Sequence, residues 1–192
     1  GWYENARRYN TFKPDQYAFS FLSRSKSITY DNLRLRDEAY GRRIDHWFAD
    51  IVRTEQGLDV PAGNPPPPMF TPFRIGEMLV QNRVVVSPMC QHSAVDGIAQ
   101  DWHLVHYGKF ALGGAALVLT ESTAVTSDSR VGFADLGIWD DDHIPGLRRI
   151  ADFIHANGAL FGIQLAHAGR KAFSEPLWEG GRPLSVEALD AS

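Results

Sequence analysis

The chain has 192 residues, of which 44% are hydrophobic and 22% are charged, and these values are ordinary for a globular protein. A net charge of −4 argues against a nucleic-acid partner, because such partners are usually met by a concentrated basic face. No stretch approaches the roughly 18 apolar residues of a membrane span. The single cysteine, Cys90, excludes an internal disulfide. Since the first residues also lack the order of a secretory signal, we expect a cytoplasmic protein.

The first sixty residues are rich in charged and aromatic side chains. Between 31 and 48 the apolar residues roughly follow helical spacing, with Arg and Asp between them, which predicts an amphipathic helix. The apolar positions are Leu33, Leu35, Ala39, Tyr40, Ile44, Trp47 and Phe48. Sixty such residues would make a marginal domain alone. We therefore interpret residues 1–60 as the tail of a larger domain.

A proline-rich segment, residues 61–68, marks a boundary. It ends in four consecutive prolines, whose fixed φ and missing N–H predict a stiff polyproline spacer rather than a strand or helix. Residues 61–68 are therefore predicted to be a linker, and residues 69–192 a second domain.

The second domain is predicted to alternate strands with helices. The expected elements are strands over 70–75 and 81–89, a helix capped by Asp101 and stopped at Gly113-Gly114, a strand over 115–120, a helix capped by Asp140 or Asp141 with Ile150, Phe153 and Ile154 buried, and a strand over 159–166. Apolar strands in this order predict parallel βαβ units. A doubly wound sheet and a TIM barrel both begin this way, and the period alone does not choose between them.

Two polar groups on these helices have structural explanations. His103 and His106 stand three residues apart on one helical face, a spacing that can hold a metal ion. No further ligand completes a set at a sensible spacing, so we interpret them as packing residues and expect no metal site. The acidic run at 140–142 is explained by capping and by the helix dipole.

Three polar stretches, at 87–92, 120–124 and 164–171, follow apolar runs. In a parallel barrel the working residues lie where strands end, so these stretches are candidates for a ligand site. Each has a structural alternative. Cys90 could be a small buried hydrophobe, Ser122 could satisfy backbone groups, and Gln164 could bond a neighbouring loop.

Five ordered blocks resemble the Old Yellow Enzyme family, most closely its bacterial, thermophilic-like branch of NADPH-dependent ene-reductases. The blocks are Met69–Ile75, Asn82–Cys90, His103–Tyr107, Asp135–Trp139 and Gly162–Lys171. The resemblance implies that the second domain is the beginning of an FMN-binding TIM (β/α)8 barrel. With about three βα units after a helical segment, the fold class is α/β with a partial barrel.

The resemblance also implies roles for individual residues around FMN. Cys90 matches a cysteine that touches the flavin and tunes its potential, and Gln164 matches a glutamine that bonds the pyrimidine edge. Ser122 stands where the branch often has alanine near the flavin. Lining residues would be Ser87, Pro88 and Met89. His92 stands where relatives commonly carry a tyrosine that reaches the substrate, which leaves its role open.

The implied reaction passes a hydride from NADPH or NADH to flavin N5 and then to an electron-poor C=C. Relatives polarise the substrate oxygen with a His-His or His-Asn pair, which would lie beyond Ser192. A whole barrel usually needs ~250 residues, so we expect this chain to be incomplete. We also expect the full-length protein to be a homo-oligomer.

The first residues resemble the C-terminal end of a flavin monooxygenase domain. The matching stretches are Trp2–Asn5, Phe19–Ser25 and Asn32–Asp37. They are similar to the domain in salicylyl-CoA 5-hydroxylase and in 2-aminobenzoyl-CoA monooxygenase/reductase, and in the latter such a domain is fused ahead of an Old Yellow Enzyme-like half. The resemblance therefore implies a bifunctional enzyme that acts on an aromatic acyl-CoA. FAD would then bind only in the missing monooxygenase part.

Two other hypotheses remain open. The chain could be a catalytically inert remnant that acts only as a folding or interaction module, because an open half-barrel exposes two sheet edges. A dienoyl-CoA reductase with an iron–sulfur cluster is a third hypothesis, and it would require a cysteine cluster further along.

Overall fold

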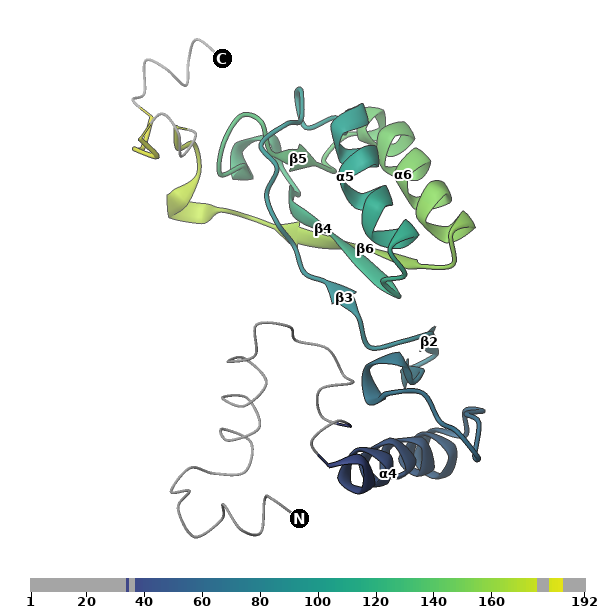
Figure 1. Ribbon diagram of the computed structural model, residues 1–192. Helices are drawn as coiled ribbons and strands as arrows, with labels where there is room; N and C mark the ends of the chain where they lie inside the picture. Colours follow the sequence, from purple (N-terminus) through teal and green to yellow (C-terminus); the bar gives the residue numbers. More distant parts are fainter. Residues whose placement is uncertain (1–33, 35–36, 176–179, 185–192) are drawn as a thin grey trace, which may run out of the picture. The chain divides into compact units, whose positions relative to one another are not determined.

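The structure, a computed structural model, describes residue 34 and residues 37–175 and 180–184 (Figure 1). The chain divides into two compact units, residues 1–79 and 80–192, and each is described by itself. The predicted monooxygenase-like stretches lie almost entirely outside the described residues.

The first unit contains one long helix, α4 (Glu38–Gln56). The side chain of Asp37 caps its start by accepting a hydrogen bond from the Tyr40 backbone N–H at 2.9 Å. Gly57, at φ 63°, closes its end in a left-handed conformation that favours glycine. The predicted helix over 31–48 is therefore confirmed only in part: α4 begins at Glu38, after the Asp37 cap, and continues eight residues beyond Phe48.

The face that α4 buries differs from the predicted one. Tyr40 and Trp47, expected on the apolar stripe, are 43% and 56% exposed. The buried positions recur every three or four residues and are mostly small: Gly41, Asp45, Ala49 and Val52. Small side chains allow close approach of neighbouring backbone, so the helix turns its small-residue side inward and its rings outward.

The proline segment leads into a short hairpin. Pro67 has the extended φ and ψ of polyproline, as predicted, while Pro68 already opens a 3-10 turn, η1 (Pro68–Phe70). Since Phe70 belongs to this turn, the predicted strand over 70–75 is shortened to β1 (Phe73–Ile75). Its partner, β2 (Met78–Val80), was not predicted. Only Gly76 and Glu77 separate the two strands.

The second unit alternates strands and helices, and its strand pairs are all parallel. The order is β3 (Val85–Val86), α5 (Asp101–Leu112), β4 (Leu117–Ala124), β5 (Leu136–Gly137), α6 (Ile144–Ala156) and β6 (Leu160–Ala166), with 3-10 turns η2 (Ser127–Ser129), η3 (Asp141–His143) and η4 (Gly169–Lys171). β4 pairs with β3, β5 and β6. The parallel sheet confirms the predicted α/β class.

Two helix starts and two strands differ in detail from the prediction. Gln100, not Asp101, is the N-cap of α5, and its backbone N–H donates to Nδ1 of His103 at 3.0 Å. Asp140 does cap a helical start, through the Asp142 N–H at 3.0 Å, but η3 intervenes before α6. The strand predicted over 81–89 is limited to two residues. β5 was not predicted because two residues carry no period.

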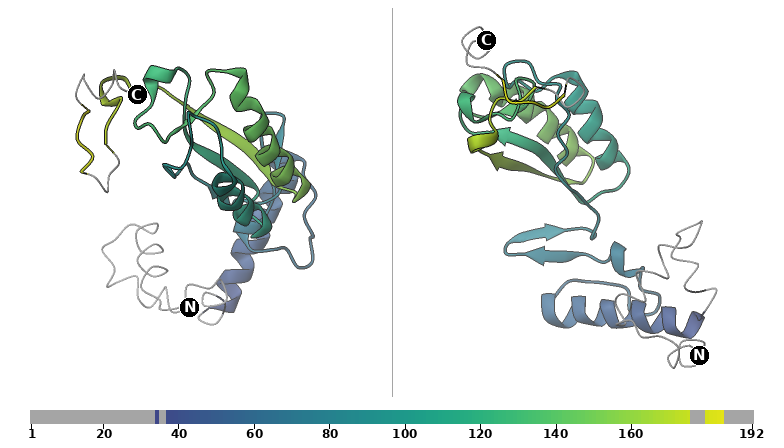
Figure 2. Two further views of the ribbon diagram at one scale, coloured as in Figure 1. Left: turned by 90° about the horizontal axis from the view of Figure 1, so that it is seen from above. Right: turned by 90° about the vertical axis from the view of Figure 1, so that its left-hand side faces the viewer.

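The core of the second unit lies between the sheet and the two helices, which cover one face of the sheet side by side (Figure 1 and Figure 2). Ile150 and Ile154 are buried as predicted, whereas Phe153 is 37% exposed. Phe153 instead lies over Gly108 of α5, where a Cβ would come within 2.8 Å of its ring. Among the helices that the structure describes, none has the length and apolarity to cross a bilayer.

Candidate active site

A bulge in β4 forms the centre of the candidate site. The register between β4 and β6 shifts between Leu119 and Ser122. Within the bulge, the Thr120 hydroxyl lies 3.1 Å from that of Thr123 and accepts a hydrogen bond from the Gln164 backbone N–H at 3.2 Å. Thr120 and Thr123 are fully buried. The irregular backbone is therefore held by its own side chains, and one of them reaches β6.

Behind the bulge lies a buried polar cluster formed by Glu121, Tyr107 and His103. The Tyr107 hydroxyl donates to Oε2 of Glu121 at 2.7 Å and accepts from the Glu121 backbone N–H at 3.0 Å. Nε2 of His103 lies 3.9 Å from Oε1 of Glu121. Burial, and then the charge of Glu121, hold the pKa of Tyr107 well above its ordinary value. The tyrosine therefore stays a neutral donor.

Sequence reasoning did not single out Glu121 or Tyr107 as functional residues. The available indication was an acidic residue directly after an apolar run of strand length, because a carboxylate buried there needs a partner. The partner itself lies on a different element, and its position follows only from the packing of α5 on β4. His103 is fully buried, in agreement with the prediction that it is a packing residue.

Cys90 follows β3 and meets the bulge. The Ser122 backbone forms a hydrogen bond with its thiol. The residue is exposed, yet partial desolvation of the sulfur raises the pKa of the thiol, and the charges of Asp135 and Glu121 act in the same direction. The structural alternative, a cysteine buried as a small hydrophobe, does not describe this position.

Gln164 completes the arrangement on the other side of β4. It stands in register with Ser122, and its side chain is exposed near the end of β6. The structure thus brings Cys90, Ser122 and Gln164 together across three neighbouring segments. In the segment that leads to Cys90, Ser87 and Met89 are exposed and Pro88 is half-buried.

The donor set suits the edge of a flavin ring. A thiol, a hydroxyl and an amide are neutral groups that can donate to ring carbonyls and accept from a ring N–H. The exposed Met89 adds apolar surface beside them. The residues present therefore fit FMN better than a metal ion, which would require carboxylate or imidazole ligands.

His92 lies in the same loop and contacts a buried carboxylate. Its Nδ1 is 3.1 Å from Oδ1 of Asp135, which is 2% exposed. The other oxygen of Asp135 accepts from the backbone N–H groups of Val131 and Gly132, each at 2.9 Å. His92 adopts φ 48°, a left-handed conformation that is uncommon outside glycine. The contact with Asp135 fixes the imidazole in this loop.

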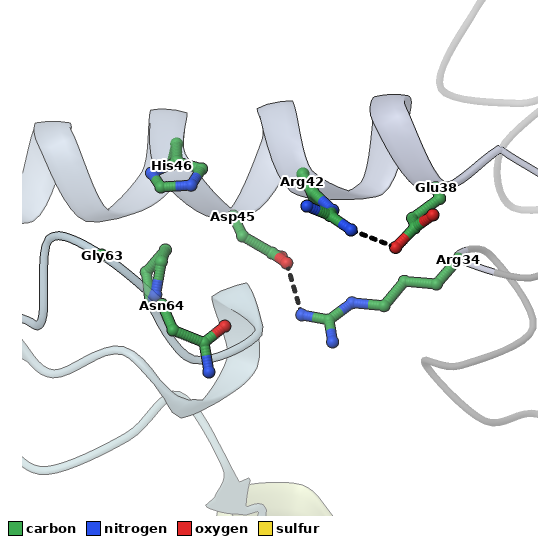
Figure 3. Close-up of a pocket in the computed structure, with 8 residues that line it drawn as sticks. Arg34, Glu38, Arg42, Asp45, His46, Gly63 and Asn64 are labelled. Carbon is green, nitrogen blue, oxygen red and sulfur yellow. Dashed lines mark hydrogen bonds and ion pairs between the residues drawn. The ribbon is translucent and has the colours of Figure 1, made fainter.

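The first unit holds a separate polar pocket of about 270 Å³ (Figure 3). Figure 3 shows that its charged side chains face one another in pairs. Arg34 contacts Asp45 at 2.8 Å, and Arg42 contacts Glu38. Burial raises the pKa of Asp45, and the charge of His46 opposes that shift. Since both arginines are neutralised by carboxylates within the pocket, its charge does not favour an anionic ligand.

The second unit thus has the opening strands of a parallel (β/α) barrel, with neutral donors gathered where the strands end. Side chains gathered where parallel strands end are typical of the ligand site of a (β/α) barrel. Comparison with known proteins gives the family. The profile of the NADH:flavin oxidoreductase / NADH oxidase family matches residues 68–192, and the chain belongs to that family. Membership indicates FMN and a nicotinamide dinucleotide as cofactors.

Curated relatives and solved structures agree with this assignment. Two NADPH dehydrogenases, from Geobacillus sp. (strain WCH70) and Listeria monocytogenes serotype 4a (strain HCC23), are 45% and 47% identical over 106 residues. That alignment covers 54% of this chain and 31% of each relative, so the chain spans about a third of their length.

Among structures, morphinone reductase is 28% identical with a TM-score of 0.51, covering 55% of this chain and 28% of that one. Old Yellow Enzyme from Pichia sp. AKU4542 is 26% identical with a TM-score of 0.53, covering 60% and 30%. The predicted resemblance of the second unit to the Old Yellow Enzyme family is confirmed.

Proposed function

We propose that this chain contributes the entry part of an FMN site in an enzyme that transfers a hydride from NADH or NADPH to an electron-poor C=C. The observation that carries the proposal is the meeting of Cys90, Ser122 and Gln164 at the β4 bulge. FMN, when bound, supplies the hydride-accepting and hydride-donating chemistry. The protein supplies the groups that hold it.

Each side chain has a distinct task in this proposal. The Gln164 amide bonds the polar edge of the ring, and the Ser122 segment, locked by the bulge, presents a donor beside it. The Cys90 thiol, kept neutral by its raised pKa, contacts the ring without adding negative charge. Ser87, Pro88 and Met89 line the approach. Neutral donors stabilise the anionic reduced ring, whereas carboxylates at the same positions would oppose it.

We further propose that the full-length protein is bifunctional, with a flavin monooxygenase domain ahead of the reductase, and that its substrate is an aromatic acyl-CoA. The support comes from the sequence alone: the resemblance of residues 2–37 to the end of such a domain, followed by a proline-rich segment and a barrel start. This proposal is tested separately, because FAD released from the full-length gene product would accompany FMN only if the monooxygenase domain is present.

The main proposal is tested on the full-length gene product by its absorbance spectrum, by FMN release on denaturation, and by anaerobic bleaching with NADPH and reoxidation by an activated alkene. Gln164→Ala should weaken FMN binding about tenfold, since it removes hydrogen bonds to the ring. The control is Val105→Ala, at a position on α5 that is 67% exposed, and it should bind FMN normally. A full-length protein with no bound flavin would contradict the proposal and support an inert remnant.

A further inference from the structure

We propose that Glu121 is a positioning residue for the FMN site: clasped by Tyr107, it fixes the β4 bulge that places Ser122 between Cys90 and Gln164. The inference rests on the proposed function, because it assigns a residue to the same site. Because Glu121 is fully buried, it has no surface with which to contact a bound FMN. It lies on the helix-facing side of β4 and acts through the backbone that follows it.

The geometry of the clasp is specific to this one residue. A single hydroxyl, that of Tyr107, bonds both the carboxylate of Glu121, at 2.7 Å, and its backbone N–H, at 3.0 Å. The carbonyl oxygen of Glu121 accepts from the hydroxyls of Thr120 and Thr123, at 3.0 and 2.9 Å. The backbone N–H, the carbonyl oxygen and one carboxylate oxygen of Glu121 are thus all held by hydroxyl groups. The next residue, Ser122, is the one that bonds the Cys90 thiol.

Stability alone does not explain a carboxylate at this position. Glu121, Tyr107 and His103 are each at most 1% exposed. Oε1 of Glu121 and Nε2 of His103 are buried without a hydrogen-bond partner, 3.9 Å apart. Burying a charge with incomplete partners is unfavourable, and an apolar side chain would pack against the same helix more favourably. Such a group is better explained by what it holds in place than by what it adds to the core.

The position of the cluster connects it to both sides of the site. Thr120, at the start of the same bulge, accepts from the Gln164 backbone at 3.2 Å, while Ser122, at its end, meets Cys90. A shift of the bulge by a fraction of an ångström therefore moves the β3 side and the β6 side relative to each other. Flavin contacts of hydrogen-bond length would not tolerate such a shift.

The test compares three variants of the full-length gene product. Glu121→Gln keeps an oxygen that accepts from Tyr107, and its FMN dissociation constant should stay within about twofold of the wild type. Glu121→Leu and Tyr107→Phe break the clasp and should raise that constant about tenfold. Ile150→Val, a cavity variant in the core of the same unit, is the control for general loss of stability, and it should bind FMN normally.

A second readout separates positioning from mere structural support. Glu121→Gln removes a buried negative charge near the site, so the midpoint potential of bound FMN should rise, because the anionic reduced ring gains stability. Asp101→Asn is the charge control, since the Asp101 side chain is 82% exposed and its charge is screened. The midpoint potential of FMN bound to Asp101→Asn should equal that of the wild type.

The outcomes are distinguishable. If the wild-type protein holds no FMN, the proposed function fails before this inference is reached. If Glu121→Leu or Tyr107→Phe folds and binds FMN as the wild type does, Glu121 is not a positioning residue. If Glu121→Leu does not fold, the other two variants decide. The inference is overturned if Tyr107→Phe binds FMN with unchanged affinity and Glu121→Gln leaves the midpoint potential of FMN unchanged.

Discussion

β4 and β6 run side by side in parallel, and both have apolar sequences, yet their burial differs sharply. Val118 of β4 is fully buried, whereas Leu165 of β6 is 64% exposed, and no residue of β6 is fully buried. Within the part of the chain that the structure describes, β4 pairs with three strands and β6 only with β4. Burial is therefore set by neighbours rather than by composition. The sequence of β6 suits a strand with a second neighbour.

The largest effect is expected from shortening one apolar side chain in each of the two strands. Val118→Ala should lower the free energy of unfolding by about 2–3 kcal/mol, because it removes buried methyl groups from the core of the second unit. Leu165→Ala should lower it by less than about 0.5 kcal/mol in this chain, since little area is buried there. Urea denaturation followed by circular dichroism measures both.

The same pair of variants in the full-length gene product sharpens the comparison. If a further strand covers β6, Leu165→Ala should become nearly as costly as Val118→Ala. If Leu165→Ala has the same small effect in this chain and in the full-length gene product, no second strand covers β6.

The next effect concerns the polar link between the two strands. Thr120→Val keeps the shape of the side chain but removes the hydroxyl that accepts from the Gln164 N–H. The free energy of unfolding should fall by about 1–2 kcal/mol, because buried polar groups lose their partner. Amide hydrogen exchange at Gln164 should accelerate. Thr126→Val, at an exposed position after β4, is the control, and similar exchange rates at Gln164 in both variants would contradict the link.

Local sequence patterns correctly predicted those features of the second unit that depend only on neighbouring residues in the chain. The glycine stop after α5 and the Ile150 and Ile154 positions of α6 are encoded within single helices, and the structure confirms them. That Cys90 and Gln164 lie on either side of the same stretch of β4 could be predicted as well, because parallel strands end at the same edge of a sheet. Rules of this kind require only the order of elements.

What the sequence did not reveal depends on contacts between elements. Glu121 and Tyr107 form their hydrogen bond only because α5 packs on β4. A single acidic residue forms no periodic pattern in the sequence, so its partner could not be predicted. The prediction of the buried face of α4 was wrong, because small residues and not aromatic ones face inward. In both cases the packing partner, rather than the local spacing, decides which side chain is buried.

A third prediction concerns the reactivity of Cys90, on the β3 side of β4. Desolvation, with the charges of Asp135 and Glu121, raises the pKa of its thiol above the ordinary 9.0, against the hydrogen bond from Ser122. Alkylation by iodoacetamide should therefore reach half its maximal rate above pH 9.0. Because the unfolded thiol ionises first, stability should decline as the pH rises through that range.

Cys90 is the sole cysteine, so the labelled site is unambiguous. Glu121→Gln removes one of the charges that raise this pKa and should move the midpoint of alkylation downward. A midpoint below pH 9.0 in the wild type would show that the thiol is not shielded by its position beside β4.

The smallest effect is expected on the solvent side of the helices that cover the two strands. Arg149 of α6 contacts Asp101 of α5 at 2.5 Å, with side chains 62% and 82% exposed. A double-mutant cycle with Asp101→Ala and Arg149→Ala should give a coupling energy below about 0.5 kcal/mol, and about 0.5 M salt should abolish it. The helices are held over β4 and β6 by buried side chains, so this pair adds little. A coupling energy above about 1 kcal/mol would contradict this expectation. It would mean that the exposed ion pair, and not only the buried side chains, holds α5 and α6 against β4 and β6.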